Sequence, residues 1–240
     1  MRRLGTGQVL SDGLRLYGIV FPFVAGMLAV THLPLDSLSI YCPDRSFGSF
    51  LGPPWYQGAM VVVVPLITAA TLGLLSTAAG GERPTWNDAA RGARRFGSLL
   101  LTLFLMRLFV LVGVFLLVVP GLYLLLCYAV AAPVAVLENR SPSQALDRSI
   151  ELTKGNLLKI LAVFGLLYAV ILSLGLGFGA AALLFPVLQS PVSQLLAGFA
   201  VTLVEHAGVA LSFAIYWQLT RGEEVRAEEA GVGLTPPVSE

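Results

Sequence analysis

Three ionisable residues inside long apolar stretches are the residues of this chain best placed to do chemistry. Arg107 lies within the apolar stretch 98–119, and Glu205 and His206 lie within 193–219. A charged group in hydrocarbon is unfavourable by about 3 kcal/mol on insertion scales, so such groups usually face a partner or water. Arg107 and Glu205 lie at similar depth in their stretches. We therefore expect them to contact each other, directly or through one water.

This pair has two interpretations, and the sequence leaves both open. As an internal staple, the pair fixes the register of two helices, which is the preferred interpretation. As a coupling or substrate site, it binds an ion or a solute. Arg107 does not readily deprotonate and therefore needs an anion or water, and Glu205 is the one carboxylate expected at that depth. His206 points about 100° away from Glu205 around a helix, so we expect it to make a different contact.

The rest of the sequence lacks motifs typical of catalysis. It contains no Gly-rich phosphate loop with a lysine, no zinc-protease histidine pair and no nucleophile elbow. The two cysteines and two histidines form no cluster typical of a metal site. A net charge of +1 gives no electrostatic basis for binding nucleic acid. We expect no catalytic residue, no metal, no cofactor and no nucleic-acid partner.

The composition indicates a membrane protein. The chain has 56% hydrophobic and 12% charged residues, whereas soluble domains carry roughly 25% charge. A stretch of about 20 apolar residues crosses about 30 Å of hydrocarbon. The sequence therefore predicts an all-α integral membrane fold with one six-span domain over residues 1–220 and a disordered tail at 221–240. The predicted spans are residues 16–33, 58–79, 98–119, 121–137, 158–183 and 193–219.

Basic residues indicate the orientation of these spans. Thirteen of the fifteen Lys and Arg residues fall at the chain ends or between alternate spans. Short loops rich in Lys and Arg stay in the cytoplasm. We therefore expect a multi-pass protein of the cell (inner or plasma) membrane, with both termini cytoplasmic. The clusters are Arg2, Arg3 and Arg15; Arg83, Arg91, Arg94 and Arg95; Arg140, Arg148, Lys154 and Lys159; and Arg221 and Arg226.

Proline and glycine predict the turns. Pro120 and Gly121 interrupt an apolar tract of about forty residues, which predicts a tight hairpin turn between the third and fourth spans. The outer segment 34–56 is rich in proline and glycine and is expected to be an irregular loop. His32 and Asp36 are expected at the start of that loop, near the bilayer edge.

A short amphipathic helix is expected before the fifth span, from Ser141 to Gly155. Ser141 is followed three residues later by Gln144, which forms a capping box, and Gly155 supplies a C-terminal stop. Leu146 and Ile150 lie on its apolar side. Such a helix is expected to lie in the headgroup plane on the cytoplasmic side, with its apolar side toward lipid.

Similar segments precede the first and third spans, at residues 6–18 and 85–97. Each begins with Thr, ends at Gly and has a basic residue near that end. This pattern is compatible with three repeats of a short helix followed by a transmembrane hairpin, and internal repeats are common in transporters. Independent re-entry of the chain into the membrane explains the same pattern, so repetition stays one of two alternatives.

The region 120–155 resembles a known membrane family. The residues that carry the resemblance are Pro120–Gly121–Leu122–Tyr123–Leu124, Ala132–Pro133–Val134, Glu138, Ser141–Pro142, Ala145–Leu146 and Ser149 to Gly155. This pattern is similar to the glycerophosphodiester phosphodiesterase membrane-domain family and related six-span prokaryotic proteins. Some relatives carry a fused phosphodiesterase domain, which is not found in this sequence. The resemblance therefore implies the membrane architecture and transfers no hydrolase activity.

Three functions are compatible with these observations. The first is a non-enzymatic subunit that organises or regulates the membrane or belongs to a larger assembly, with lipids and either a membrane-protein partner or a second copy as partners. The second is a small transporter or permease for a lipid-like or amphipathic solute. The third is a membrane-embedded lipid enzyme, which needs a cluster of His, Asp or Glu near one interface that the sequence does not offer.

Overall fold

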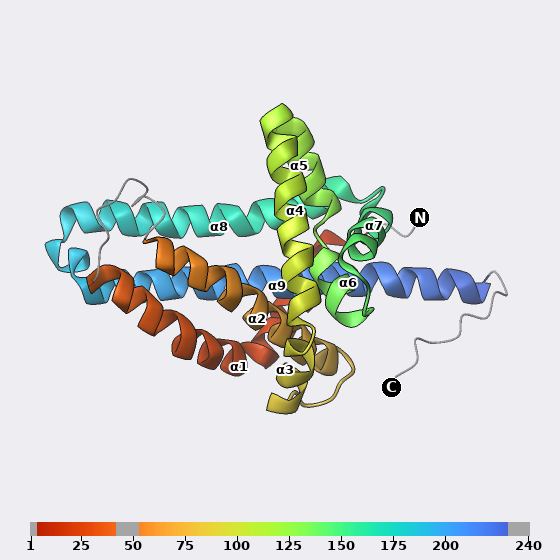
Figure 1. Cartoon of the computed structure of the whole chain (residues 1–240), viewed down its shortest axis with the longest axis horizontal. Coiled ribbons are helices and arrows are strands. Elements are labelled where there is room, and N and C mark those ends of the chain that lie inside the picture. Colours follow the sequence, from red (N-terminus) through yellow and green to blue (C-terminus); the bar gives the residue numbers. More distant parts are fainter. Residues whose placement is uncertain (1–3, 42–52, 230–240) are drawn as a thin grey trace.

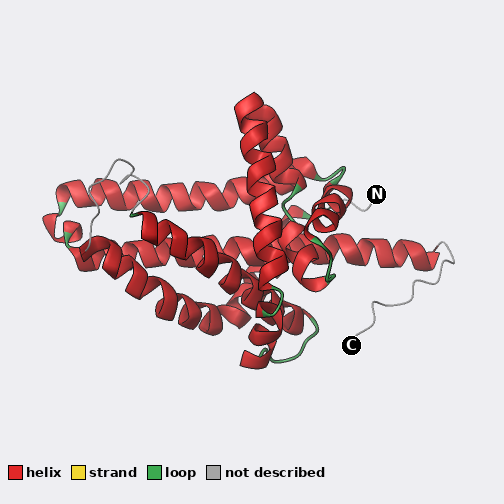
Figure 2. Ribbon diagram, in the orientation of Figure 1, coloured by secondary structure: helices red, strands yellow, loops and turns green. Residues whose placement is uncertain are grey.

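The computed structural model describes residues 4–41 and 53–229, and within them side chains are described at 4–39 and 53–222. These residues form helices and loops, with no strand among them (Figure 2). Six segments are long and apolar enough to cross a membrane, which confirms the predicted all-α, six-span fold. The helices are α1 (Thr6–Tyr41), α2 (Pro54–Ala79), α3 (Trp86–Ala93), α4 (Phe96–Leu116), α5 (Val118–Cys127), α6 (Ala131–Leu137), α7 (Pro142–Thr153), α8 (Leu157–Leu184), the 3-10 helix η2 (Pro186–Gln189) and α9 (Pro191–Glu229).

Four long helices form a bundle, and a helical hairpin crosses it. Helices α1, α2, α8 and α9 run in similar directions, whereas α4 and α5 pair with each other and run across them (Figure 1). The most extensive packing joins α1 to α9. Val24 and Leu28 of α1 and Phe213 of α9 are fully buried in this core. The hairpin packs mainly on α2 of the bundle and on the shorter helices α6 and α7.

Much of the apolar surface faces outward. In α8 only Ile160 and Val163 are buried, and in α4 only Leu99, Thr102 and Gly113 are. Soluble monomers rarely expose contiguous apolar patches of more than a few hundred Å². Outward-facing leucine and phenylalanine are stable in hydrocarbon, so the structure is that of a multi-pass membrane protein.

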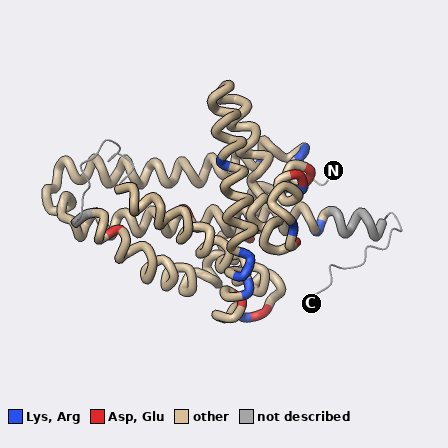
Figure 3. Tube along the Cα trace, viewed as in Figure 1, with Lys and Arg blue, Asp and Glu red and all other residues tan. Residues whose placement is uncertain are grey.

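Charged residues gather at one side of the structure, around α3 and α7, while the long helices carry few (Figure 3). We call this the charged end and define it by Arg91, Arg95, Arg140 and Arg148. Several contacts hold it together. The Arg95 side chain donates to Asn139, and Ser98 Oγ donates to the carbonyl of Arg140 at 3.1 Å. The start of α4 is thereby fixed to the loop between α6 and α7.

The first and last helices are longer than the sequence predicted. Residues 6–18 belong to α1 without a break, so the prediction of a separate interfacial helix there is wrong. Residues 34–41 also continue α1, with Pro34 inside it, so this part of the expected loop is helical, and 42–52 lie outside the described residues. Helix α9 continues to Glu229, where a disordered tail was expected; residues 230–240 lie outside the described residues.

The short helix α3 is packed on the protein. Gly92 of α3 meets Gly73 of α2 so closely that a Cβ atom on either would collide with the opposing backbone. Both the backbone and the hydroxyl of Thr85 donate to the Asp88 carboxylate, at 2.7 and 2.8 Å, to cap the helix. The hydrogen bond from the Thr85 side chain, with help from Arg91, lowers the pKa of Asp88 to about 2, although burial opposes the shift. Asp88 therefore stays ionised at neutral pH.

Helix α7 confirms the predicted amphipathic helix but not its environment. Ser141 and Gln144 form the capping box, and Gly155 ends the segment at a φ of 84°. Leu146 is only 3% exposed and packs with Tyr128 and Ala131, and Ile150 packs against the same cluster. The expectation that this side faces lipid is wrong. The protein itself covers it, because α7 is needed to bond the backbone of a broken span, as described below.

The hairpin turn between the third and fourth spans precedes Pro120 and Gly121. Leu117 is the extended residue that separates α4 from α5, so the predicted position is wrong by about three residues. Pro120 lies in the first turn of α5, where backbone N–H groups have no partner within the helix and proline is tolerated. Gly121 contacts Gly113 and Val114 of α4, and a Cβ atom there would lie 2.7 Å from the backbone nitrogen of Val114.

Replacing Gly121 by Ala tests whether this close contact holds the hairpin together. The added methyl group meets backbone atoms that cannot rotate away, so we expect a loss of about 1–3 kcal/mol in unfolding free energy. The matched control is Gly175→Ala in α8, where an added Cβ has no neighbour within 4 Å. Thermal unfolding of both variants in detergent measures the difference. Equal stability of the two variants would contradict the packing described.

Candidate functional site

The fourth span is broken near its middle. Helix α5 ends at Cys127, α6 begins at Ala131, and residues 128–130 form a turn. In hydrocarbon a free backbone carbonyl is unfavourable by several kcal/mol, so a broken span requires other donors. The carbonyl of Cys127 loses its helical donor because the N–H of Ala131 bonds to the carbonyl of Tyr128 instead, at 3.0 Å.

Two hydroxyl groups of α7 bond the freed Cys127 carbonyl. Ser149 Oγ donates to it at 2.8 Å, and Thr153 Oγ1 donates to it at 3.2 Å with a hydrogen that it shares with the Ser149 carbonyl at 2.8 Å. Ser149 and Thr153 are fully buried. These bonds explain why α7 lies inside the protein at the level of the break, with its apolar side against Tyr128.

A third hydroxyl group bonds the carbonyl that proline leaves free. Pro133 has no N–H, so it cannot bond the carbonyl of Ala129 four residues earlier. Ser212 of α9 donates to that carbonyl at 2.6 Å. The break therefore links α5 and α6 to both α7 and α9, and it fixes the position of the adjacent surface.

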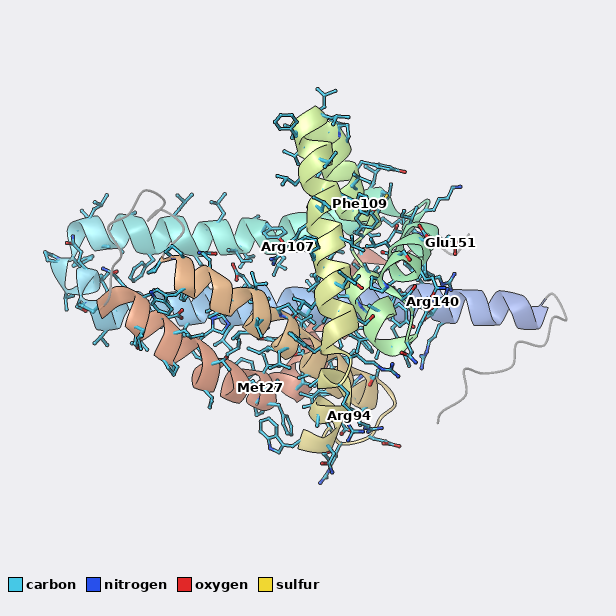
Figure 4. The ribbon with its side chains drawn as sticks, in the orientation of Figure 1. Met27, Arg94, Arg107, Phe109, Arg140 and Glu151 are labelled. Carbon is cyan, nitrogen blue, oxygen red and sulfur yellow. The ribbon has the colours of Figure 1, made fainter. Side chains whose placement is uncertain are left out.

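A cavity of about 460 Å³ opens beside this break. Its walls come from α2, α4, α5, α6, α8 and α9 and include Tyr128, Ala129 and Ser212. Most of the other lining is leucine, valine, phenylalanine and methionine. Arg107 lies where α4 crosses α8 (Figure 4), and it lines the cavity together with Glu205 of α9. A largely apolar wall with one cation and one anion suits an amphipathic ligand.

The expected direct contact between Arg107 and Glu205 is not formed. Both side chains are described, both are exposed, and no ion pair joins them. They line the same cavity from opposite helices. The hairpin crosses the bundle, so α4 and α9 diverge, and this geometry keeps the two charges apart. A contact through one water stays a prediction. Arg107 and Glu205 therefore do not form a direct staple between α4 and α9.

His206 makes a contact different from that of Glu205, as its helical position indicated. Its ring packs edge to face against His32 of α1, with ring centroids 6.3 Å apart. His32 was expected at the start of a loop, but it is buried within α1. The α1–α9 interface therefore holds a histidine pair next to the cavity residue Glu205.

The residues that bond the broken span were not predicted, because single Ser, Thr and Pro residues form no recognisable sequence pattern. Pro133 is followed by an amphipathic segment that contains Ser and Thr. This order of residues predicted neither the break in the span nor the hydroxyl groups that bond it. Ser149 is a small residue of an amphipathic segment, and Ser212 lies in an otherwise apolar span, so neither was expected as a donor. A proline inside a predicted span, with hydroxyl residues on another helix, is the signal that would have suggested such a bond.

These features define a multi-pass α-helical membrane protein with a discontinuous span and an intramembrane cavity. The comparison with protein families places it further. A family model described as a domain of unknown function, DUF7847, matches residues 96–220, more than half of the chain, and the chain belongs to that family. No curated protein and no solved structure matches it. The likeness of residues 120–155 to the glycerophosphodiester phosphodiesterase membrane-domain family is not shown by this match.

The bond from Ser212 to the Ala129 carbonyl gives a direct test of the broken span. Ser212→Ala leaves that carbonyl without its donor, so we expect a loss of about 1 kcal/mol in unfolding free energy. Ser173→Ala is the matched control, because the Ser173 hydroxyl bonds only to a carbonyl of its own helix on an exposed face. Equilibrium unfolding in mixed micelles measures both.

A double-mutant cycle shows whether proline is the cause. Pro133→Ala restores an N–H four residues after Ala129, so Ser212→Ala is expected to cost less in that background than in the wild type. Additive effects of the two substitutions would contradict the proposed origin of the free carbonyl.

Proposed function

We propose that this protein binds an amphipathic, lipid-like molecule in the cavity beside the broken span and carries it across the membrane. The observation that supports this most is that Arg107 and Glu205 line the same cavity. The rest of its wall is largely apolar, and no ion pair joins the two residues. Ligand cavities usually measure about 300–1,000 Å³, mostly apolar with a few polar groups. The volume of about 460 Å³ falls within this range.

The charges suggest the polar part of the ligand. Arg keeps its charge in hydrocarbon and offers a planar set of donors that fits a phosphate or carboxylate. Glu205 offers an acceptor for an amine or hydroxyl group on the same ligand. Acyl chains longer than the cavity have an apolar path along exposed α4 and α8, where Leu108 and Leu161 face outward. A phospholipid or single-chain lipid with a phosphate headgroup fits this arrangement.

A discontinuous helix at the binding cavity supports transport in particular. In many transporters the substrate lies against helices that are broken near the middle of the bilayer. Here Tyr128 and Ala129, both part of the break, line the cavity. The contacts that hold α4 and α5 in place lie mainly with α2, α6 and α7, so a change in tilt of the hairpin would alter access to the cavity.

The orientation belongs to the same proposal. We propose that the charged end faces the cytoplasm, because short segments rich in Lys and Arg stay on that side, and that the start of α1 and the end of α9 lie on the cytoplasmic side of the cell membrane. The sequence resemblance to the glycerophosphodiester phosphodiesterase membrane-domain family agrees with a role at membrane lipids and adds no catalytic step.

An assembly or regulatory subunit is the second candidate. It is favoured by the hairpin, whose end carries large exposed side chains and extends away from the bundle (Figure 1). Phe115 is 90% exposed, and Leu116, Leu117 and Val118 are also exposed. In a membrane, contact with lipid explains this exposure equally well. The cavity therefore distinguishes the two candidates, and it favours binding and transport.

Replacing Arg107 by Gln tests the binding site. The probe is lysophosphatidylethanolamine labelled with a nitrobenzoxadiazole group on its acyl chain. Loss of a charge-assisted hydrogen bond to phosphate is expected to weaken its binding to the purified protein by about 10- to 100-fold, as measured by fluorescence titration. Arg83→Gln is the control, because Arg83 is exposed in the loop between α2 and α3, and it is expected to bind as the wild type does.

Transport is measured separately with the same lipid in reconstituted vesicles. The wild-type protein is expected to accelerate movement of the probe between leaflets, and Arg107→Gln is expected to abolish most of that acceleration. Binding without any acceleration would overturn transport in favour of a lipid-binding subunit. Equal binding by Arg107→Gln and Arg83→Gln would overturn the cavity as the site.

A further inference from the structure

Two buried histidines face each other between α1 and α9, outside the cavity. His32 is 5% exposed and His206 is 6% exposed, and their rings meet edge to face. Neither Nε2 atom has a hydrogen-bond partner within the protein, and both atoms are fully buried. A buried polar atom without a partner is unfavourable, and two such atoms on a pair of contacting rings in a membrane-spanning region are unusual for simple packing.

One contact determines the proton arrangement of His206. Its Nδ1 lies 3.0 Å from the carbonyl oxygen of Thr202. A carbonyl only accepts, so Nδ1 must carry the hydrogen and donate it. In the neutral ring Nε2 is then an unprotonated acceptor. The His206 ring thus presents a buried lone pair with no donor from the protein.

Carboxylates lie near both ends of this pair. Asp36 lies one turn along α1 from His32, within electrostatic reach of it, and accepts a hydrogen bond from Tyr56 of α2 at 2.7 Å. Glu205 precedes His206 on α9 and lies within electrostatic reach of Tyr56. Among the other titratable groups of the packed helices, Tyr17 of α1 donates to the carbonyl of Leu203 on α9 at 2.6 Å. Arg107 of α4 and Tyr168 of α8 line the cavity that Glu205 also lines.

We propose that His32 and His206 form a single proton-binding site, which connects the Asp36–Tyr56 pair at one end of α1 with Glu205 in the cavity. One proton added to the pair occupies the lone pair of His206 Nε2 or its counterpart on His32, and Asp36, which lies within electrostatic reach of His32, stabilises the resulting positive charge. Chains of Asp, Glu and His inside membranes are typical of proton relays. A last step rests on the proposed transport: if that transport is correct, the proton bound at this site is the coupling ion.

Nuclear magnetic resonance of labelled histidine tests the site without any ligand. The chain contains two histidines, so protein labelled with ¹³C and ¹⁵N histidine and purified through a tag without histidine reports on this pair alone. In the wild type we expect His206 in the neutral form with the hydrogen on Nδ1. We also expect the two rings to titrate as a coupled pair, in two separated steps.

Variants test the coupling. His32→Gln keeps a polar side chain and is expected to change the proton affinity of His206 by about tenfold or more, since the two rings interact. The wild-type titration tests the proposal even if that variant fails to fold. Independent titration of the two rings, or the Nε2-protonated form of His206, would overturn the proposal.

Arg107→Gln separates this site from the proposed function. It removes the expected ligand anchor and leaves the histidines unchanged, so the coupled titration is expected to persist in this variant. If Arg107→Gln binds lipid normally while the histidines remain coupled, the proton site stands and the proposed ligand site fails. If the histidines titrate independently while Arg107→Gln loses lipid binding, the ligand site stands and the proton site is rejected.

Discussion

The satisfaction of the broken backbone in the fourth span is the constraint on which the rest of the structure depends. Two carbonyls, of Cys127 and Ala129, lose their helical donors inside an apolar region. Ser149 and Thr153 of α7 supply donors to one, and Ser212 of α9 supplies a donor to the other. A membrane offers few other donors, so α7 and α9 must stay where they are while the break exists.

This constraint explains the cavity. Because α6 is held against α7 and α9, the chain changes direction at the break. Helices α4 and α5 therefore run across the other spans (Figure 1). The cavity opens between the hairpin, α8 and α9, so Arg107 and Glu205 face a common space without closing into an ion pair. Ser212, which bonds the backbone of the break, thus also lines the cavity that contains Arg107 and Glu205.

Sequence patterns predicted the number and type of elements well, because long apolar stretches and charge clusters reflect solvent transfer and orientation along single helices. The capping box at Ser141 and Gln144 also depends on residues three apart and was predicted correctly.

Three features could not be predicted in this way, because they depend on residues far apart in sequence or on glycine acting as a packing residue. They are the break at residues 128–130, the close contact of Gly121 with Gly113 and the approach of His32 to His206. Pro120 and Gly121 mark a turn by local rules, yet here the proline begins the next helix and the glycine serves close packing. The Arg107–Glu205 contact was expected from equal depth along two helices, but depth does not fix the angle between helices, which decides whether the two charges meet.

The most direct test of the account is photocrosslinking from inside the cavity. A photoreactive residue replaces Met106, which lines the cavity, or Phe104, which is exposed on the outer face of α4, and the protein is irradiated in lipid nanodiscs and examined by mass spectrometry. From position 106 we predict one discrete adduct with an amphipathic molecule carrying a phosphate or carboxylate, and its loss in the Arg107→Gln background. From position 104 we predict adducts with bulk lipid that do not depend on Arg107. The same bulk-lipid adducts from both positions, or only crosslinks within the protein from position 106, would contradict the account.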